Sequence, residues 1–249
     1  MYGGNKLLTY DLSKSGKQIF AQGAYDYLYV NIKAGEIYKV IDLRSFSVYF
    51  FSLPTDTEIT INGEKYEISQ GDALQVEGVS LKFSATRDMG IFVSGVYEKK
   101  TDKTGLTVKQ HNAIYKVEKP WGHELWISGD NHPSYAFKQI FVKKGTKTSL
   151  QYHNVKRETN VLVEGRCYLH FKKNDEVSND NVKSDDIGTT ELKQISVIDI
   201  VPQTLHRLEA ITDIMLYETS TPYLDDVIRV QDDAKRPDGR IDEEHKKII

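Results

Sequence analysis

Short apolar segments recur along almost the whole chain, and this recurrence constrains the fold more than any other feature. The segments are rich in Val, Ile, Tyr, Phe and Thr and are separated by Gly, Asn, Asp and Pro. Such a pattern is typical of an all-β sandwich or barrel. The Asn62-Gly63 pair between two alternating runs predicts a type I′ hairpin turn. In the first half we expect strands at residues 27–32, 47–52, 58–61, 64–68, 72–76, 80–84 and 91–97.

The second half repeats this organisation after a charged stretch. Residues 98–105 contain no apolar side chain and predict an interdomain linker, which divides the chain into domains 1–104 and 105–249. Residues 172–193 are polar and predict a long exposed excursion. The tail from Asp232 is charged and predicts a short helix or a frayed end. Further strands are expected at residues 136–143, 148–153, 160–164, 166–171, 194–200, 207–210 and 214–220.

Composition limits the size, the partners and the compartment. The 249 residues are 39% hydrophobic, which is enough for one or two domains. Lys and Arg number 33 against 36 Asp and Glu, and neither sign gathers in one half, which argues against a nucleic-acid or membrane partner. No apolar run could cross a bilayer and no signal-peptide order opens the chain, so we expect a cytoplasmic protein. The single Cys167 predicts a small buried hydrophobe.

The histidines point to a metal site in the second half. No histidine precedes residue 111, so the first half is expected to be a structural or dimerising barrel. Gln151 and His153 are two residues apart on an expected strand and therefore project from the same face. Glu158 follows after a turn, and His206 follows a proline-fixed turn further on. This mixed nitrogen and oxygen set suits Zn²⁺, Mn²⁺, Fe²⁺ or Ni²⁺, and the absence of thiolates argues against a structural zinc site.

The spacing of these residues resembles the two motifs of the cupin superfamily. The first motif extends from Gly145 to Gly165, and the second is centred on residues 202–206. Within the superfamily, residues 117–240 are similar to the type II phosphomannose isomerase domain. The stretches that carry this resemblance are Lys119-Pro-Trp-Gly122, Ser149-Leu-Gln-Tyr-His153, Glu158, Gly165, Val201-Pro-Gln-Thr-Leu-His-Arg-Leu208 and Asp225-Asp-Val-Ile-Arg229.

The resemblance implies two double-stranded β-helix barrels, of which the first is degenerate and free of metal. The second barrel would bind a divalent metal, with zinc expected first and Mn, Fe, Ni or Co as alternatives. Ser149 resembles the serine near the substrate phosphate, Glu218 the acid/base glutamate and Arg229 the arginine over the sugar phosphate. Cupins usually pair through edge strands or swapped N-terminal segments, so a homodimer is expected, or an internal pseudo-dimer of the two barrels. The implied metal ligands are Gln151, His153, Glu158 and His206.

The implied function is a metal-dependent sugar-phosphate isomerase that interconverts mannose 6-phosphate and fructose 6-phosphate. The alternatives are another metal-cupin sugar or nucleotide-sugar isomerase or epimerase, and a non-catalytic carbohydrate-binding bicupin. Family members read His-His-His-Arg-Ala-Glu-His-Trp where this chain reads His153-Asn-Val-Lys-Arg-Glu158-Thr-Asn, which keeps the ligands but leaves the substrate open. Arg229 and Glu218 also have a purely structural alternative. The arginine would belong to a surface ion-pair network with nearby aspartates, and the glutamate would be a surface carboxylate.

Overall fold

A computed structural model describes residues 6–98, 100–128, 132–173 and 187–245. Within these residues the chain is built from antiparallel strands, and one short 3-10 turn, η1 (His111–Ala113), is the single helical element. The all-β expectation is therefore confirmed. The chain divides into two compact units: an N-terminal unit of residues 10–115 and 126–137, and a C-terminal unit that holds the rest of the described chain. This division differs from a single cut after residue 104.

The N-terminal unit consists of a six-stranded sheet in the order β11-β8-β5-β10-β3-β2 and a four-stranded sheet in the order β4-β9-β6-β7. Its core is apolar throughout, and Phe46, Phe50 and Phe83 are fully buried in it. The strands are β2 (Gly16–Ala21), β3 (Asp26–Ile32), β4 (Tyr38–Val40), β5 (Ser45–Ser52), β6 (Ile59–Ile61), β7 (Glu64–Tyr66), β8 (Ala73–Glu77), β9 (Leu81–Ala85), β10 (Met89–Val96) and β11 (Gly105–Lys109).

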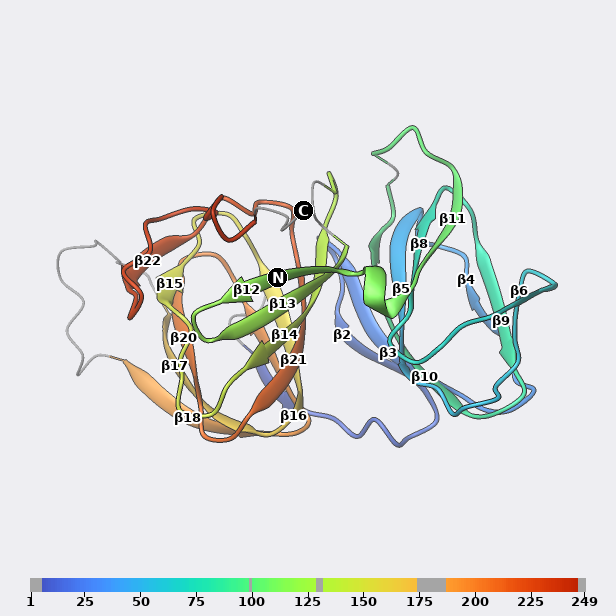
Figure 1. The fold of residues 1–249 in the computed structure, drawn as a ribbon, viewed down its shortest axis with the longest axis horizontal. Helices are drawn as coiled ribbons and strands as arrows, with labels where there is room; N and C mark the ends of the chain where they lie inside the picture. Colours follow the sequence, from blue (N-terminus) through green and yellow to red (C-terminus); the bar gives the residue numbers. More distant parts are fainter. Residues whose placement is uncertain (1–5, 99, 129–131, 174–186, 246–249) are drawn as a thin grey trace. The chain divides into compact units, whose positions relative to one another are not determined.

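The C-terminal unit is built on a seven-stranded sheet in the order β1-β19-β16-β21-β14-β13-β12 and a five-stranded sheet in the order β18-β17-β20-β15-β22. Residue 115 of β12, residues 126–128 of β13 and residues 136–137 of β14 belong to the N-terminal unit. Figure 1 labels the strands of these two sheets except β1 and β19. They are β1 (Lys6–Thr9), β12 (Tyr115–Lys119), β13 (Gly122–Ser128), β14 (Ala136–Val142), β15 (Leu150–Tyr152), β16 (Glu158–Glu164), β17 (Arg166–Lys173), β18 (Gly188–Lys193), β19 (Ser196–Ile200), β20 (Thr204–Ala210), β21 (Ile214–Ser220) and β22 (Ile228–Gln231).

The turns show where local sequence decides the fold and where pairing decides it. Asn62 and Gly63 adopt φ angles of 53° and 92° between β6 and β7, as the hairpin prediction requires. The expected linker is followed at once by β11, which pairs with β8, so no unit boundary lies there. The expected polar excursion is partly wrong, because β17 reaches Lys173 and residues 188–193 pair with it as β18. Residues 174–186 lie outside the described residues.

The inward positions of the C-terminal unit change from apolar to charged along the strands. On β16, Leu162 belongs to the core, while Asn160 and Glu158 continue the same side of the strand and are also buried. On the neighbouring β21, Leu216 belongs to the core and Glu218 follows two residues later. Because residues two apart on a strand share a face, the unit has an apolar end and a polar end inside the same sheets. A metal-binding or catalytic site is therefore expected at the polar end.

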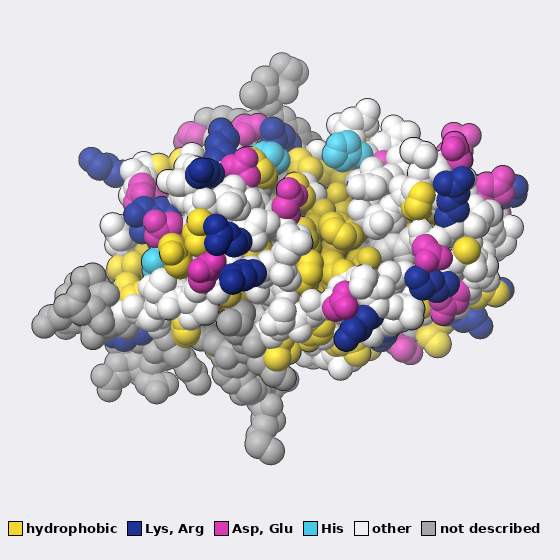
Figure 2. Space-filling model, turned by 90° about the horizontal axis from the view of Figure 1, so that it is seen from below, with side chains coloured by type: hydrophobic (Ala, Val, Ile, Leu, Met, Phe, Trp, Pro, Cys, Tyr) yellow, Lys and Arg dark blue, Asp and Glu magenta, His cyan; other side chains and the backbone are white. Residues whose placement is uncertain are grey.

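The tail from Asp232 forms turns, with no helix in its described part. Arg236 contacts Asp232 at 2.6 Å and Glu244 at 3.2 Å, so ion pairs hold the segment. On the face of the molecule in Figure 2, lysine and arginine side chains lie among aspartate and glutamate side chains. No described helix is long and apolar enough to cross a membrane.

Two glycines allow a test of close packing at the turns of the C-terminal unit. Gly145 and Gly165 have φ angles of 76° and 83°, so alanine at either position costs about 1–2 kcal/mol of backbone strain. A Cβ on Gly165 would lie 2.1 Å from the carbonyl oxygen of Asp213, whereas a Cβ on Gly145 meets nothing within 4 Å. We expect Gly165→Ala to lower the free energy of unfolding by roughly 1–3 kcal/mol more than Gly145→Ala. Denaturant titration measures both, and equal losses would contradict the described turn.

Candidate functional site

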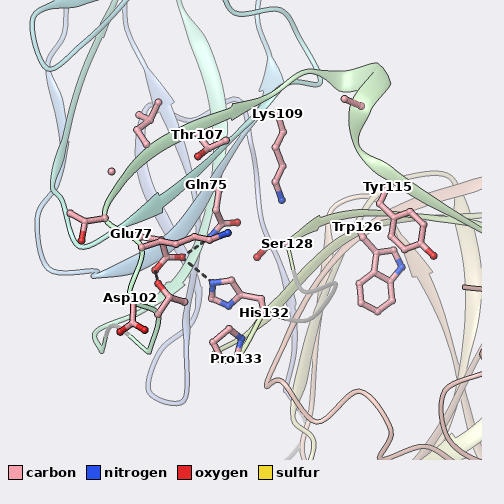
Figure 3. A pocket seen from close by; sticks show the side chains of 16 residues that line it. Gln75, Glu77, Asp102, Thr107, Lys109, Tyr115, Trp126, Ser128, His132 and Pro133 are labelled. Carbon is pink, nitrogen blue, oxygen red and sulfur yellow. Dashed lines mark hydrogen bonds and ion pairs between the residues drawn. The ribbon is translucent and has the colours of Figure 1, made fainter. Parts of the chain in front are cut away.

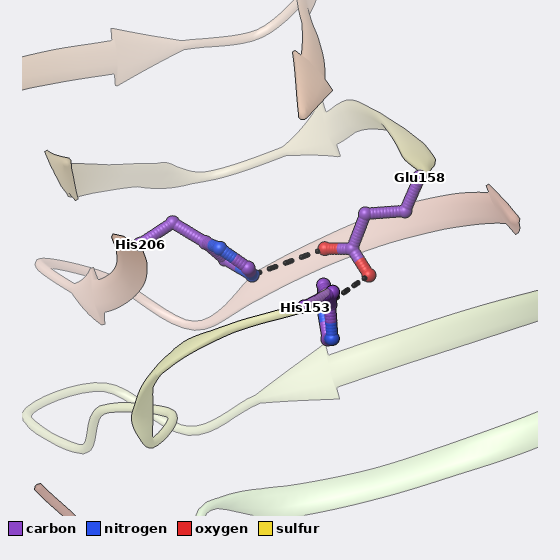
Figure 4. A group of neighbouring side chains, drawn as sticks. All are labelled: His153, Glu158 and His206. Carbon is purple, nitrogen blue, oxygen red and sulfur yellow. Dashed lines mark ion pairs between the residues drawn. The ribbon is translucent and has the colours of Figure 1, made fainter. Parts of the chain in front are cut away.

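Three side chains converge at the polar end of the C-terminal unit. His153 follows β15, Glu158 begins β16 and His206 lies on β20. Their ligand atoms lie within 4.8 Å of one another, and all three side chains are buried. The carboxylate lies between the rings, with 3.3 Å from Oε2 to His153 Nε2 and 3.2 Å from Oε1 to His206 Nε2, as Figure 4 shows. The structure therefore brings three of the four expected ligands together.

The hydrogen bonds of the two rings show that the site fits a cation. His153 Nδ1 donates to the carbonyl of Asp226, and His206 Nδ1 donates to the carbonyl of Thr204 at 2.9 Å. A neutral ring that donates from Nδ1 keeps a lone pair on Nε2, so two lone pairs face one carboxylate. Buried His153 Nε2 has no hydrogen-bond partner among the described residues. Metal-binding histidines are oriented in this same way by a backbone carbonyl on the other nitrogen.

The charge states suit metal coordination as well. Burial, followed by the nearby Lys156 ammonium, lowers the pKa of His153 below its ordinary value, which keeps the ring neutral. Burial alone would raise the pKa of Glu158, but the adjacent Lys156 ammonium holds it well below its ordinary range. Metal ligands must be neutral imidazoles and ionised carboxylates. His153 and Glu158 are thus in the protonation states that a divalent cation needs.

Asp226 fixes the turn that carries His153. Its carboxylate accepts the backbone N–H groups of Asn154, Val155 and Lys156 at 2.9, 2.7 and 2.8 Å. Burial would raise the pKa of Asp226, yet these three N–H groups lower it. The same residue therefore orients the ring through its carbonyl and the turn through its side chain. Its place within the Asp225 to Arg229 stretch was recognised from the sequence, but its role was not.

The fourth expected ligand has a different partner. Gln151 lies directly opposite His206 in the pairing of β15 with β20, which puts the two residues on one face of the sheet. Its Oε1 accepts a hydrogen bond of 2.6 Å from Ser149 Oγ. A carbonyl oxygen has two lone pairs, so this bond leaves one acceptor position for a metal. The expected phosphate-binding Ser149 is thus a buried residue that positions Gln151.

Lys156 is the main residue that the sequence analysis missed. Its side chain is buried, and its Nζ lies 2.6 Å from Glu158 Oε2 and 3.3 Å from Glu218 Oε1. Burial alone would lower the pKa of Lys156, but these two carboxylates raise it. The ammonium therefore links the metal ligand to the expected acid/base residue. Lys156 lies in a turn, so no strand periodicity could have singled it out.

The charged row continues away from the metal ligands. Lys138 contacts Glu218 at 3.5 Å and Glu124 at 4.0 Å, and Lys119 contacts Glu124 at 3.7 Å. Lys119 also contacts Glu244 in the tail at 2.7 Å. Buried charges of one sign are costly unless the other sign is adjacent, and here the signs alternate. Lys138 lies in phase with the core residues Ile140 and Val142 on β14, which is a signal that the sequence contained.

Arg229 is engaged by the tail. It pairs with Gln151 in the register of β15 and β22, so it lies near the candidate site along the sheet. Its Nη1 donates to the carbonyls of Pro237 and Gly239, the latter at 2.8 Å. Backbone carbonyls of the tail therefore hold the guanidinium, and the backbone N–H of Arg229 donates to the carboxylate of Asp238 at 2.7 Å.

The remaining expectations near the barrel concern packing. Cys167 is fully buried in the apolar core, and burial raises the pKa of its thiol to about 12, so it behaves as the small hydrophobe that we predicted. Trp121 packs into the same core. His123 stacks on Phe141, with ring centroids 5.1 Å apart. These contacts belong to the structure of the barrel.

Removal of a candidate ligand should weaken metal retention. We expect His206→Ala and Glu158→Gln to weaken metal binding by at least ~10-fold each, since even the outer partners of metal ligands contribute that much. The matched control is His170→Ala, because His170 is part of a strand pair with Thr189 and Glu209 outside the cluster. Elemental analysis of the purified proteins measures the metal. Equal metal content in all variants would exclude the site.

Lys156 gives a second test, on stability. Lys156→Met should lower the free energy of unfolding by about 3–5 kcal/mol, because it leaves two buried carboxylates without their cation. Bound metal should restore part of this loss, since it supplies positive charge beside Glu158 and stabilises the folded state by mass action. Thermal unfolding with and without added metal measures both effects. A variant that gains no more from metal than the wild type contradicts this account.

Comparisons with known proteins agree with this geometry. The family described as mannose-6-phosphate isomerase C-terminal matches residues 104–232. Among solved structures, E. coli protein YlbA aligns with a TM-score of 0.64 at 12% identity, covering 89% of this chain and 93% of that chain. An IolB-like protein from Salmonella typhimurium aligns with a TM-score of 0.64 at 14% identity, covering 96% of this chain and 97% of that chain. Streptomyces albus HEPD, with 2-hydroxyethylphosphonate and Fe(II) bound, aligns with a TM-score of 0.60 at 9% identity, covering 88% of this chain and 76% of that chain.

The solved structures establish the fold, and the family match establishes the relationship. At these identities the structural likeness carries no information about activity. The comparison with curated proteins gives no match. The family match, in contrast, covers slightly more than half of the chain and includes His153, Glu158 and His206. The chain therefore belongs to the mannose-6-phosphate isomerase C-terminal family, within the cupin superfamily.

Proposed function

We propose that this protein is a metal-dependent aldose–ketose isomerase that acts on sugar phosphates, of the mannose 6-phosphate to fructose 6-phosphate type. One observation supports the proposal most: two imidazole Nε2 atoms converge on the ionised Glu158 at the buried polar end of the C-terminal unit. Family membership supports it independently. The proposal needs a cation, a group that moves a proton and a means of holding the sugar.

The cation would be held by His153, Glu158 and His206, with Gln151 as a fourth ligand. A mixed nitrogen and oxygen set accepts several first-row ions. Zinc is our first choice, and Mn, Fe, Ni or Co are alternatives. When bound, such an ion supplies Lewis-acid stabilisation of the negative charge that develops on the sugar oxygen, a contribution of several kcal/mol.

Glu218 would move the proton between the adjacent carbons. Both lysines that contact it, Lys138 and Lys156, approach Oε1, so we assign the proton to Oε2. The two ammonium groups hold the orientation of the carboxylate through Oε1. A positioned general base of this kind typically contributes 10²–10⁴-fold to the rate, roughly.

One observation favours the alternative of a sugar isomerase or epimerase whose substrate carries its charge elsewhere. The Nη1 group of Arg229 is already bound by the carbonyls of Pro237 and Gly239. A phosphate at this position would have to compete with these bonds or use other donors of the guanidinium. The Nε atom of Arg229 is buried and has no hydrogen-bond partner among the described residues. A phosphate bound by Arg229 would therefore use this atom as its donor.

The test incubates metal-loaded protein with mannose 6-phosphate and, separately, with fructose 6-phosphate. We expect each to form the other, and we expect Glu218→Gln to lower kcat by about 10²–10⁴-fold with unchanged metal content. The matched control is Glu164→Gln, because Glu164 is an exposed glutamate at the far end of the neighbouring strand. No conversion with Zn, Mn, Fe, Ni or Co would exclude this activity. A screen of neutral sugars and nucleotide sugars then tests the alternative.

A further inference from the structure

We propose that the N-terminal unit has a binding site of its own, a polar cavity that accepts a neutral sugar or polyol. The cavity has a volume of about 770 Å³ and is lined by residues of this unit alone. Ligand sites in proteins are typically clefts of ~300–1,000 Å³, so it is large enough for a small carbohydrate. It takes no part in the isomerase proposal, because it contains none of the metal ligands.

The cavity lies on the face of the six-stranded sheet that is opposite to the core. On β8, Leu74 and Val76 belong to the apolar core, whereas Gln75 and Glu77 line the cavity. Strand side chains alternate between the two faces, so the polar pair projects away from the core. A sheet face that carries buried polar side chains next to a cavity is unusual for a purely structural barrel.

Glu77 connects the polar residues of the cavity wall. Its side chain is buried, and its Oε1 accepts hydrogen bonds from Ser45 Oγ at 3.0 Å, Gln75 Nε2 at 3.1 Å and His132 Nε2 at 3.0 Å. Its Oε2 accepts one hydrogen bond, from Thr101 Oγ1 at 3.0 Å. A carboxylate oxygen can accept at least two hydrogen bonds, and Oε1 of Glu77 accepts three. Oε2 therefore retains capacity for a hydroxyl donor of a ligand.

A second group of polar atoms, beside Glu77, holds Gln75 in place. The hydroxyl of Tyr135 is fully buried and contacts Ser47 Oγ at 2.9 Å and Gln75 Nε2 at 3.1 Å. Ser47 Oγ also donates to Gln75 Oε1 at 3.1 Å. These bonds fix the amide of Gln75 at the cavity wall, so its orientation is set before any ligand arrives. Preorganised polar groups lower the cost of binding.

The opposite wall is aromatic and the charges of the lining are balanced. Figure 3 shows Trp126 and Tyr115 together on one side and Glu77 on the other. Aromatic rings pack against apolar faces of a ligand while carboxylates and amides accept its hydroxyl groups. The two carboxylates of the lining, Glu77 and Asp102, are matched by two ammonium groups. The two ammonium groups belong to Lys103 and Lys109. A lining with balanced charge favours a neutral ligand over a phosphate or an amine.

Saturation-transfer NMR with the full chain tests the proposal. The probes are D-mannose, D-glucose and D-mannitol, with glucosamine and mannose 6-phosphate as charged comparisons. We expect at least one neutral probe to receive saturation more strongly than both charged probes. Glu77→Gln and Thr101→Val should weaken that binding by at least tenfold, and Tyr115→Ala, a half-buried wall position, serves if either variant fails to fold.

The control is His206→Ala, which removes a metal ligand and leaves the cavity intact. Binding that persists in this variant and is lost in the cavity variants supports the proposal. Loss of binding in His206→Ala, or undiminished binding in all cavity variants, places the sugar elsewhere and overturns it. No saturation transfer from wild-type protein to any neutral probe also overturns it, whereas the isomerase assay is unaffected by any of these results.

Discussion

The C-terminal unit depends on one carboxylate and the cations that surround it. Glu158 is buried between two imidazoles and the Lys156 ammonium, in an environment where an unpaired charge would cost several kcal/mol. The row of alternating charges through Glu218 and Lys138 extends the same solution across the sheet. The polar end of the barrel exists because each charge compensates the next.

The sequence predicted the strands and the ligands for a common physical reason. Alternating apolar residues define which face of a strand is buried, and that rule also placed Gln151 and His153 on one side. Glu158 and His206 were found by their spacing, and they do meet His153 in the structure. Strand β18 was missed because its composition is polar, and its pairing with β17 makes it a strand. Strand β11 was missed although Leu106 and Val108 alternate in it; its pairing with β8 identifies it.

What the sequence could not predict were partners created by the tertiary fold. Lys156 reaches Glu218 across 62 residues of chain, and Asp226 binds the turn after His153 across about 70. The polar cavity around Glu77 likewise joins β8 to His132, 55 residues away. No local sequence pattern predicts such long-range contacts. Lys138 is an exception, because it is in phase with the core positions of its strand and could have been predicted to be buried.

The pairing of β1 with β19 has a consequence for how the chain can be divided. Residues 6–9 form the outermost strand of the seven-stranded sheet and run beside residues 196–199, so the C-terminal unit takes its edge from the opposite end of the polypeptide. A fragment that begins at residue 105 would expose the backbone N–H and C=O groups of β19, and open edges of this kind recruit strands from other molecules. The C-terminal unit can therefore fold on its own only if residues 6–9 come with it.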